Sequence, residues 1–330
     1  MKNTVQRRCD LLVENRQLVS KALVLESSII RAVAAASYTE KDMSVDVDQL
    51  KDCIKLLKKK QGAFSYLHGN STLIIAAKMA LSGNPEGYLD DVIEVNKVFQ
   101  KGKFFGSYYR VLAAMSICDA GRAAQAEEIV EKTNILLKGM SKSHPWLTSD
   151  EDTSFAVLLA MTDKSTEEIL SELEDSYQYI KDKFSFHDNA AYSLSQVLTT
   201  LEGNYDRKGE KALEIFDAFK EAGSKYGKNY ELASIGALVN VNMNTEELVS
   251  EVIEVADYLK DNKGFGMLDM DKHTRLMLGT MIVAGSYSDE KAPVSASVTS
   301  GAIATVIAQQ LCMYVAIMAA STSAAVSSSN

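Results

Sequence analysis

The sequence predicts an all-α protein, an α-solenoid of about six helix-pair repeats with a period of about 40 residues. One observation behind this prediction is an internal echo, because Phe-Ser-Tyr at 64–66 returns about 120 residues later as Phe-Ser-Phe at 184–186. Another is that apolar stretches close at steps of 38 to 42 residues, at Gly83, Gly121, Asp163, Gly203, Asn244 and Gly285. Gly suits a helix end because it adopts the left-handed conformation without strain. A single pair cannot cover its own apolar face, so neighbouring pairs are expected to stack.

Residues 1–48 are expected to cap the N-terminal end of this array. Apolar residues at helical spacing predict one or two helices over 3–36, and a polar loop follows over 39–48. Lys21, Glu26 and Arg31 interrupt the apolar pattern and exclude a membrane span in this segment.

Residues 49–285 contain the predicted pairs, each with an amphipathic first helix and a more apolar second helix. Helix starts are marked by Asn84 before Pro85 and by Ser165 three residues before Glu168, the spacing of a capping box. Four of the expected second helices cover 73–81, 111–117, 155–161 and 276–283. Because these stretches are apolar on more sides, we expect them to lie between neighbouring pairs.

Residues 286–330 are expected to form an apolar C-terminal helix, acting as a second cap, and a Ser- and Ala-rich tail. The apolar run at 301–320 is long enough to cross a bilayer. Gln309 and Gln310 at its centre, and many Ala residues, favour a buried terminal helix instead. A tail anchor in a membrane and a helix that docks on a partner remain the alternatives.

The composition limits which classes of partner and which cellular compartment are expected. A net charge of −9 argues against nucleic acid, because binding to phosphates draws mainly on Lys and Arg. The four Cys residues form no C-x-x-C pair, so neither a zinc site nor a redox motif is indicated. The N-terminus carries several charges and no uninterrupted apolar core, so a cytoplasmic protein with reduced thiols is expected. No cofactor and no metal site is predicted.

The candidate binding residues lie in the turns that join first to second helices, and they are aromatic, His and Asp side chains. These candidates are Phe64, Tyr66, His68, Tyr109, Phe184, Phe186, His187, Asp188 and His273. Aromatic side chains in a row could anchor a peptide, or they could pack neighbouring pairs together. The His and Asp residues could form an acid–base pair or a metal site, or they could serve as turn residues. Neither H-x-x-x-H nor H-E-x-x-H spacing occurs, so catalysis is not indicated.

The segment 64–71, Phe-Ser-Tyr-Leu-His-Gly-Asn-Ser, together with Ile-Ile-Ala-Ala at 74–77 and the Ala- and Ser-rich end, resembles a bacterial family known only as a domain of unknown function. The resemblance covers nearly the whole chain. It implies an all-helical cytoplasmic bacterial protein, and it implies no activity, cofactor or functional residue.

The leading hypothesis is a non-catalytic scaffold that binds a protein or peptide on its curved face or its turn edge. One alternative is a metal-dependent or small-molecule enzyme that uses His68, His187, Asp188 or His273. Another is a membrane-tethered adaptor held by residues 301–320.

Overall fold

The computed structural model describes residues 1–23, 26–60, 72–102 and 106–287 of the chain. Helices make up its regular structure, and these described residues contain no β-strand, so the predicted all-α class is confirmed. The predicted cap and tail over 288–330, including the run at 301–320, lie outside the described residues.

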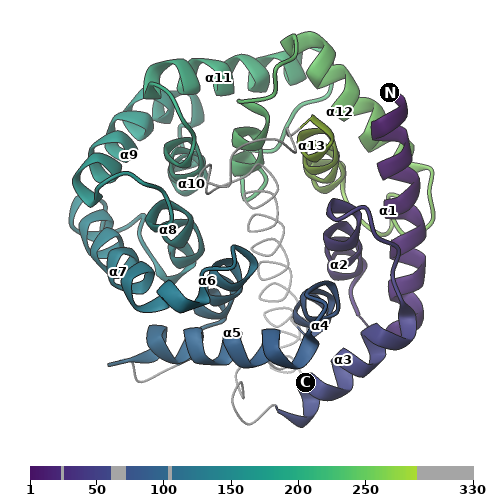
Figure 1. Cartoon of the computed structure of the whole chain (residues 1–330). Helices are drawn as coiled ribbons and strands as arrows, with labels where there is room; N and C mark the ends of the chain where they lie inside the picture. The colour runs from purple at the N-terminus through teal and green to yellow at the C-terminus, as the bar shows by residue number, and fades with distance from the viewer. Residues whose placement is uncertain (24–25, 61–71, 103–105, 288–330) are drawn as a thin grey trace, which may run out of the picture.

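The helices form two concentric rings (Figure 1). The outer ring consists of α1 (Asn3–Ala22), α3 (Val47–Lys59), α5 (Pro85–Gln100), α7 (Ala126–Ser143), α9 (Thr166–Ile180), α11 (Tyr205–Glu221) and α12 (Thr245–Lys260). The inner ring consists of α2 (Ser28–Glu40), α4 (Thr72–Leu81), α6 (Tyr108–Asp119), α8 (Thr153–Ala160), α10 (Asp188–Thr200), the 3-10 helix η5 (Leu232–Leu238) and α13 (Lys272–Tyr287). Each outer helix therefore pairs with the inner helix that follows it in the chain.

The α-solenoid of six repeats is not confirmed, because the described helices close into a ring. Helix α1 lies against α12 and α13 of the last pair (Figure 1). Across this seam the Tyr258 hydroxyl donates to Asp10 Oδ1 at 2.5 Å, and the backbone N–H of Lys2 donates to Glu251 Oε1 at 2.7 Å. Helices α1 and α2 thus form a further pair in the ring.

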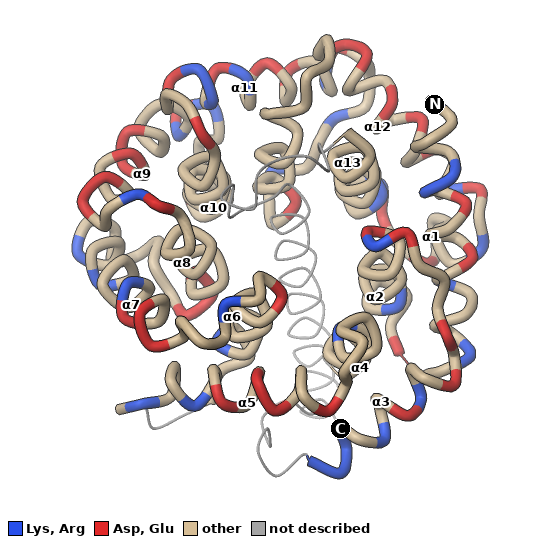
Figure 2. The backbone as a smooth tube through the Cα atoms, viewed as in Figure 1, with Lys and Arg blue, Asp and Glu red and all other residues tan. Residues whose placement is uncertain are grey.

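Burial explains why the ring closes. An open array needs a polar outer face on its terminal helices, whereas α1 carries Val5, Cys9 and Leu12, all fully buried. Closing the ring buries the apolar side of α1 and that of the last pair at the same time. Figure 2 shows the charged residues concentrated on the outer helices, with few on the inner ones.

Local sequence signals set several helix ends. Ser165 and Glu168 form a reciprocal capping box at the start of α9, with hydrogen bonds of 3.2 and 2.7 Å. Gly83 and Gly203 adopt positive φ angles of 74° and 99° just after α4 and α10. Gly285, in contrast, lies inside α13.

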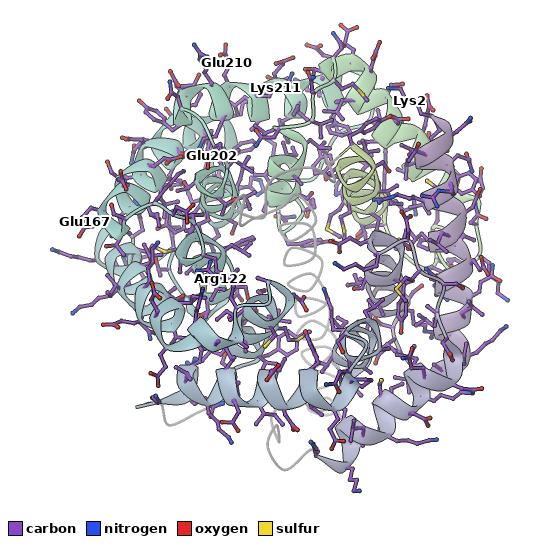
Figure 3. The ribbon with its side chains drawn as sticks, in the orientation of Figure 1. Lys2, Arg122, Glu167, Glu202, Glu210 and Lys211 are labelled. Carbon is purple, nitrogen blue, oxygen red and sulfur yellow. The ribbon has the colours of Figure 1, made fainter. Side chains whose placement is uncertain are left out.

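At one edge of the ring, cationic side chains join the carboxyl ends of neighbouring inner helices. Arg122 follows α6 and donates from Nη1 to the carbonyl of Met161 after α8, at 2.9 Å (Figure 3). Lys164 follows α8 and donates from Nζ to the carbonyl of Thr199 at the end of α10, also at 2.9 Å. Each cation neutralises the partial negative charge at a helix carboxyl end and links adjacent pairs.

Candidate functional site

A cleft of about 550 Å³ opens at the opposite edge of the ring, where the outer-to-inner connections lie; we call this the turn edge. Its walls come from the amino ends of α6 and α10, from the connection before α8 and from the segment before η5. Its aromatic lining is Tyr109, Phe186 and Tyr230, and its charged and polar lining includes Glu151, His187, Asp188, Lys228 and Asn229. The volume falls in the range of small-ligand and anchor pockets.

A buried polar contact positions the wall that carries Glu151. Ser149 and Asp152 form a capping box around the 3-10 turn η3 (Asp150–Asp152), which precedes α8. Asp152 is 6% exposed, and it accepts hydrogen bonds from Ser149 N at 2.7 Å and from Gln196 Nε2 of α10 at 2.6 Å. Burial raises the pKa of the Asp152 carboxyl to about 6. Asp152 therefore ties α8 to α10 directly behind the cleft.

Glu151 is oriented by a phenol from the neighbouring pair. The Tyr109 hydroxyl, at the start of α6, donates to Glu151 Oε1 at 3.0 Å. Burial, followed by the charge of Glu151, raises the pKa of Tyr109, so this hydroxyl stays a donor at neutral pH. Beside them, Arg110 Nη2 pairs with Asp150 Oδ1 at 3.0 Å.

Asp188, which lines the same cleft from the neighbouring pair, is oriented in a similar way. It is the first residue of α10, where a carboxylate is favoured by the partial positive charge of the helix amino end. The Tyr177 hydroxyl donates to Asp188 Oδ1 at 3.2 Å, and burial raises the pKa of Tyr177 to about 12. Among the described residues, no Lys or Arg pairs with Asp188.

His144 lies beneath this wall and is held on several sides. Its Nε2 is 2.6 Å from Glu174 Oε2, and its ring packs edge-on against Tyr177 and Tyr192 at centroid distances of 5.0 and 5.2 Å. These contacts give His144 a structural place between α7, α9 and α10.

Phe184 and Phe186, two residues apart, have opposite environments. Phe184 is fully buried, and its ring packs edge-on against Phe216 at 4.9 Å. Phe186 has a φ angle of 69°, and its side chain is 97% exposed at the rim of the cleft. Phe184 thus packs between pairs, while Phe186 is available to a ligand.

The structure brings together four of the predicted candidates, Tyr109, Phe186, His187 and Asp188, in one cleft. His273 lies at the next connection, where its Nδ1 is 3.7 Å from Oε1 of buried Glu231. Phe64, Tyr66 and His68 lie outside the described residues.

Sequence reasoning missed Glu151 and Lys228 as lining residues, and it placed Tyr230 among the aromatic residues of the connections without choosing it as a candidate. Glu151 could have been found from the Ser-x-x-Asp spacing at 149–152 before an apolar run. Lys228 carries no comparable motif in the sequence.

Within the described ranges, no cluster of three or more His, Cys, Asp and Glu side chains has the geometry to hold a metal ion. In the same ranges, none of the helices combines the length and the apolar character that a membrane crossing needs.

Comparison with known proteins identifies a family. Residues 15–312 match the model of a family described as "Protein of unknown function (DUF4003)". No curated protein and no solved structure matches the chain.

Proposed function

The chain belongs to the DUF4003 family, whose description states no activity, and we propose from the cleft that it binds a peptide or a protein segment at its turn edge. The observation that carries the proposal is the state of Phe186. A residue other than glycine in the left-handed conformation costs roughly 1–2 kcal/mol. Leaving a Phe side chain in water forgoes a further stabilisation of about 1.5–3 kcal/mol. Such cost at an exposed aromatic residue on a cleft rim fits an anchor for a partner better than a structural role.

Other exposed apolar side chains on the turn edge support the same proposal. Trp146, in the connection after α7, is 93% exposed, and Leu268, in the connection before α13, is fully exposed. Trp is enriched among residues that dominate binding energy, and large exposed apolar side chains on one side of a molecule are typical of protein-binding surfaces.

The proposal places the protein in the cytoplasm. Cys9, Cys53 and Cys118 are free thiols, which fits a reducing compartment. Burial raises the pKa of Cys9 and Cys118 to about 12 and that of Cys53 to about 11, so these thiols stay protonated at neutral pH.

Selection from a random peptide library displayed on phage, with the full chain as bait, tests this function. We expect enriched peptides to bind the wild type, and Phe186→Ala to weaken that binding about tenfold or more. Phe186→Gly should lose binding equally while its stability stays within about 1 kcal/mol of wild type, since Gly tolerates this backbone. Met43→Ala is the matched control, because Met43 is exposed on the other edge of the ring. A failure to enrich any peptide, or binding that Phe186→Ala and Phe186→Gly leave intact, would contradict the proposal.

A second candidate function is a small-molecule enzyme. It is favoured by the meeting of His187, Asp188 and Glu151 in one cleft, which supplies an imidazole and two carboxylates for proton transfer. Turnover of a panel of ester and glycoside substrates, abolished by His187→Ala without a change in thermal stability, would support it over the binding function.

A further inference from the structure

We propose that the cleft recognises a positively charged side chain, Arg or Lys, of the bound peptide segment. This inference rests on the proposed binding function and names the chemistry of its ligand. It is argued from the two carboxylates, the aromatic rings and the placement of the nearby cations.

The two carboxylates reach the cleft from neighbouring pairs and are fixed in direction. Glu151 is oriented by the Tyr109 hydroxyl at 3.0 Å, and Asp188 by the Tyr177 hydroxyl at 3.2 Å. A carboxylate offers about four acceptor positions, so it can accept several hydrogen bonds at once. Two such groups in the lining of one cleft match the several donors of a guanidinium or an ammonium group.

Aromatic rings in the same cleft complement the charge. Tyr109, Phe186 and Tyr230 all line it, and the Tyr230 hydroxyl is anchored within 3.2 Å of Thr274 Oγ1. A cation above the face of an aromatic ring is attracted by the negative charge of the π system. Rings and carboxylates together therefore favour a cation that also carries an apolar stem, as Arg and Lys do.

Lys228 lines the cleft and Arg110 lies beside it, and each has a contact with another side chain. Lys228 Nζ lies 5.7 Å from the centroid of the Phe216 ring, and Arg110 is paired with Asp150. Among the described lining residues, His187 and Lys228 are the groups that can carry positive charge, and Glu151 and Asp188 carry the negative charge. Two further carboxylates, Asp152 and Glu231, are buried close behind the walls, at 6% and 1% exposure. Oε2 of Glu231 has no hydrogen-bond partner among the described residues.

A carbohydrate could also use aromatic rings and carboxylates, but the surroundings of the cleft favour a peptide. Trp146, Met267 and Leu268 are exposed on the same edge, and aliphatic side chains such as Met and Leu suit the apolar residues of a protein segment. Binding of a neutral oligosaccharide in place of peptides is therefore an outcome of the test that would overturn the inference.

The test uses the full chain and the phage-displayed library, followed by calorimetry with the best enriched peptide. We expect Arg or Lys at one fixed position of the enriched peptides. Replacement of that Arg by the neutral isostere citrulline (or of that Lys by norleucine) should weaken binding about tenfold or more. Asp188→Asn and Glu151→Gln should each reduce the preference for the charged peptide. Glu167→Gln should not, since Glu167 is exposed at the start of α9 on the opposite edge (Figure 3).

The outcomes separate the two proposals. Enriched peptides that bind through Phe186 but lack a basic residue, or that bind equally well with citrulline or norleucine, would overturn the cation inference and leave the binding function standing. A chain that enriches no peptide, or that binds neutral oligosaccharides alone, would overturn both. A Glu151→Lys variant sharpens the result, because it should shift the selection from basic to acidic peptides if the inference is correct.

Discussion

Asp152 offers a direct test of the polar contact behind the cleft. Its carboxyl is 6% exposed, and burial raises its pKa from 3.8 to about 6. Because the folded state holds this proton more tightly than the unfolded chain does, folding is favoured when the group is protonated. The resulting penalty is fully present above pH 6 and is relieved as the pH falls through the interval between the two pKa values. A shift of this size corresponds to a penalty of about 3 kcal/mol at neutral pH.

Asp152→Asn removes this titration. The variant also loses one acceptor, because both Asp152 oxygens accept hydrogen bonds, from Ser149 N and Gln196 Nε2. That loss costs about 1–3 kcal/mol and does not depend on pH. We therefore expect the wild type to gain about 2 kcal/mol over the variant when the pH is lowered from about 7.5 to about 4.

Urea unfolding of both proteins at several pH values measures this difference. Other titrating groups are shared by the two proteins and cancel in the comparison. A difference in unfolding free energy that stays constant over this pH range would refute the reasoning, and so would a gain for the variant at acid pH.

Three further sets of variants test the packing. Phe184→Ala should destabilise the protein by about 3–5 kcal/mol, because the Phe184 ring is buried. Phe186→Ala should change the stability by less than about 0.5 kcal/mol, because the Phe186 ring is exposed. Equal melting temperatures of these two variants would contradict this prediction. Glu172→Gln should lower the free energy of unfolding in urea by about 3–5 kcal/mol, because it leaves the almost fully buried Lys208 without its ion-pair partner. If this is the cause, adding Lys208→Met to the Glu172→Gln variant should restore stability. Additive losses in the double variant would contradict it. Tyr258→Phe removes a hydrogen bond between α12 and α1 and should lower the free energy of unfolding by about 0.5–1.5 kcal/mol. Amide hydrogen exchange should become faster first in α1 and α12. An equal increase in the exchange rate over all helices would contradict this prediction.

The parts of this fold that sequence could predict are those governed by neighbours in the chain. The all-α class follows from periodicity, and the start of α9 follows from Ser165 and Glu168, which lie within one helical turn of each other. The closure of the ring depends instead on contacts such as Tyr258 with Asp10. Small differences in the packing geometry of successive helix pairs accumulate around the array, and their total cannot be predicted from a local sequence pattern.

The candidate site shows the same division. Their positions in turns predicted that Tyr109, Phe186, His187 and Asp188 share one edge, and in the structure these four residues line one cleft. The Phe-Ser-Phe pattern at 184–186 could not distinguish the buried Phe184 from the exposed Phe186, which has a left-handed backbone. Tyr230 joins the cleft only because the segment before η5 reaches across to the amino end of α10.

The seam between α1 and α12 bears on how a partner meets this molecule. An open solenoid can change its curvature because its ends are free. In a closed ring, the spacing between two neighbouring helix pairs can increase only if the spacing elsewhere in the ring decreases. The gap between the walls of the cleft is thus set by the whole circumference. A ligand would therefore bind to a cleft whose walls already have the separation that they keep in the complex.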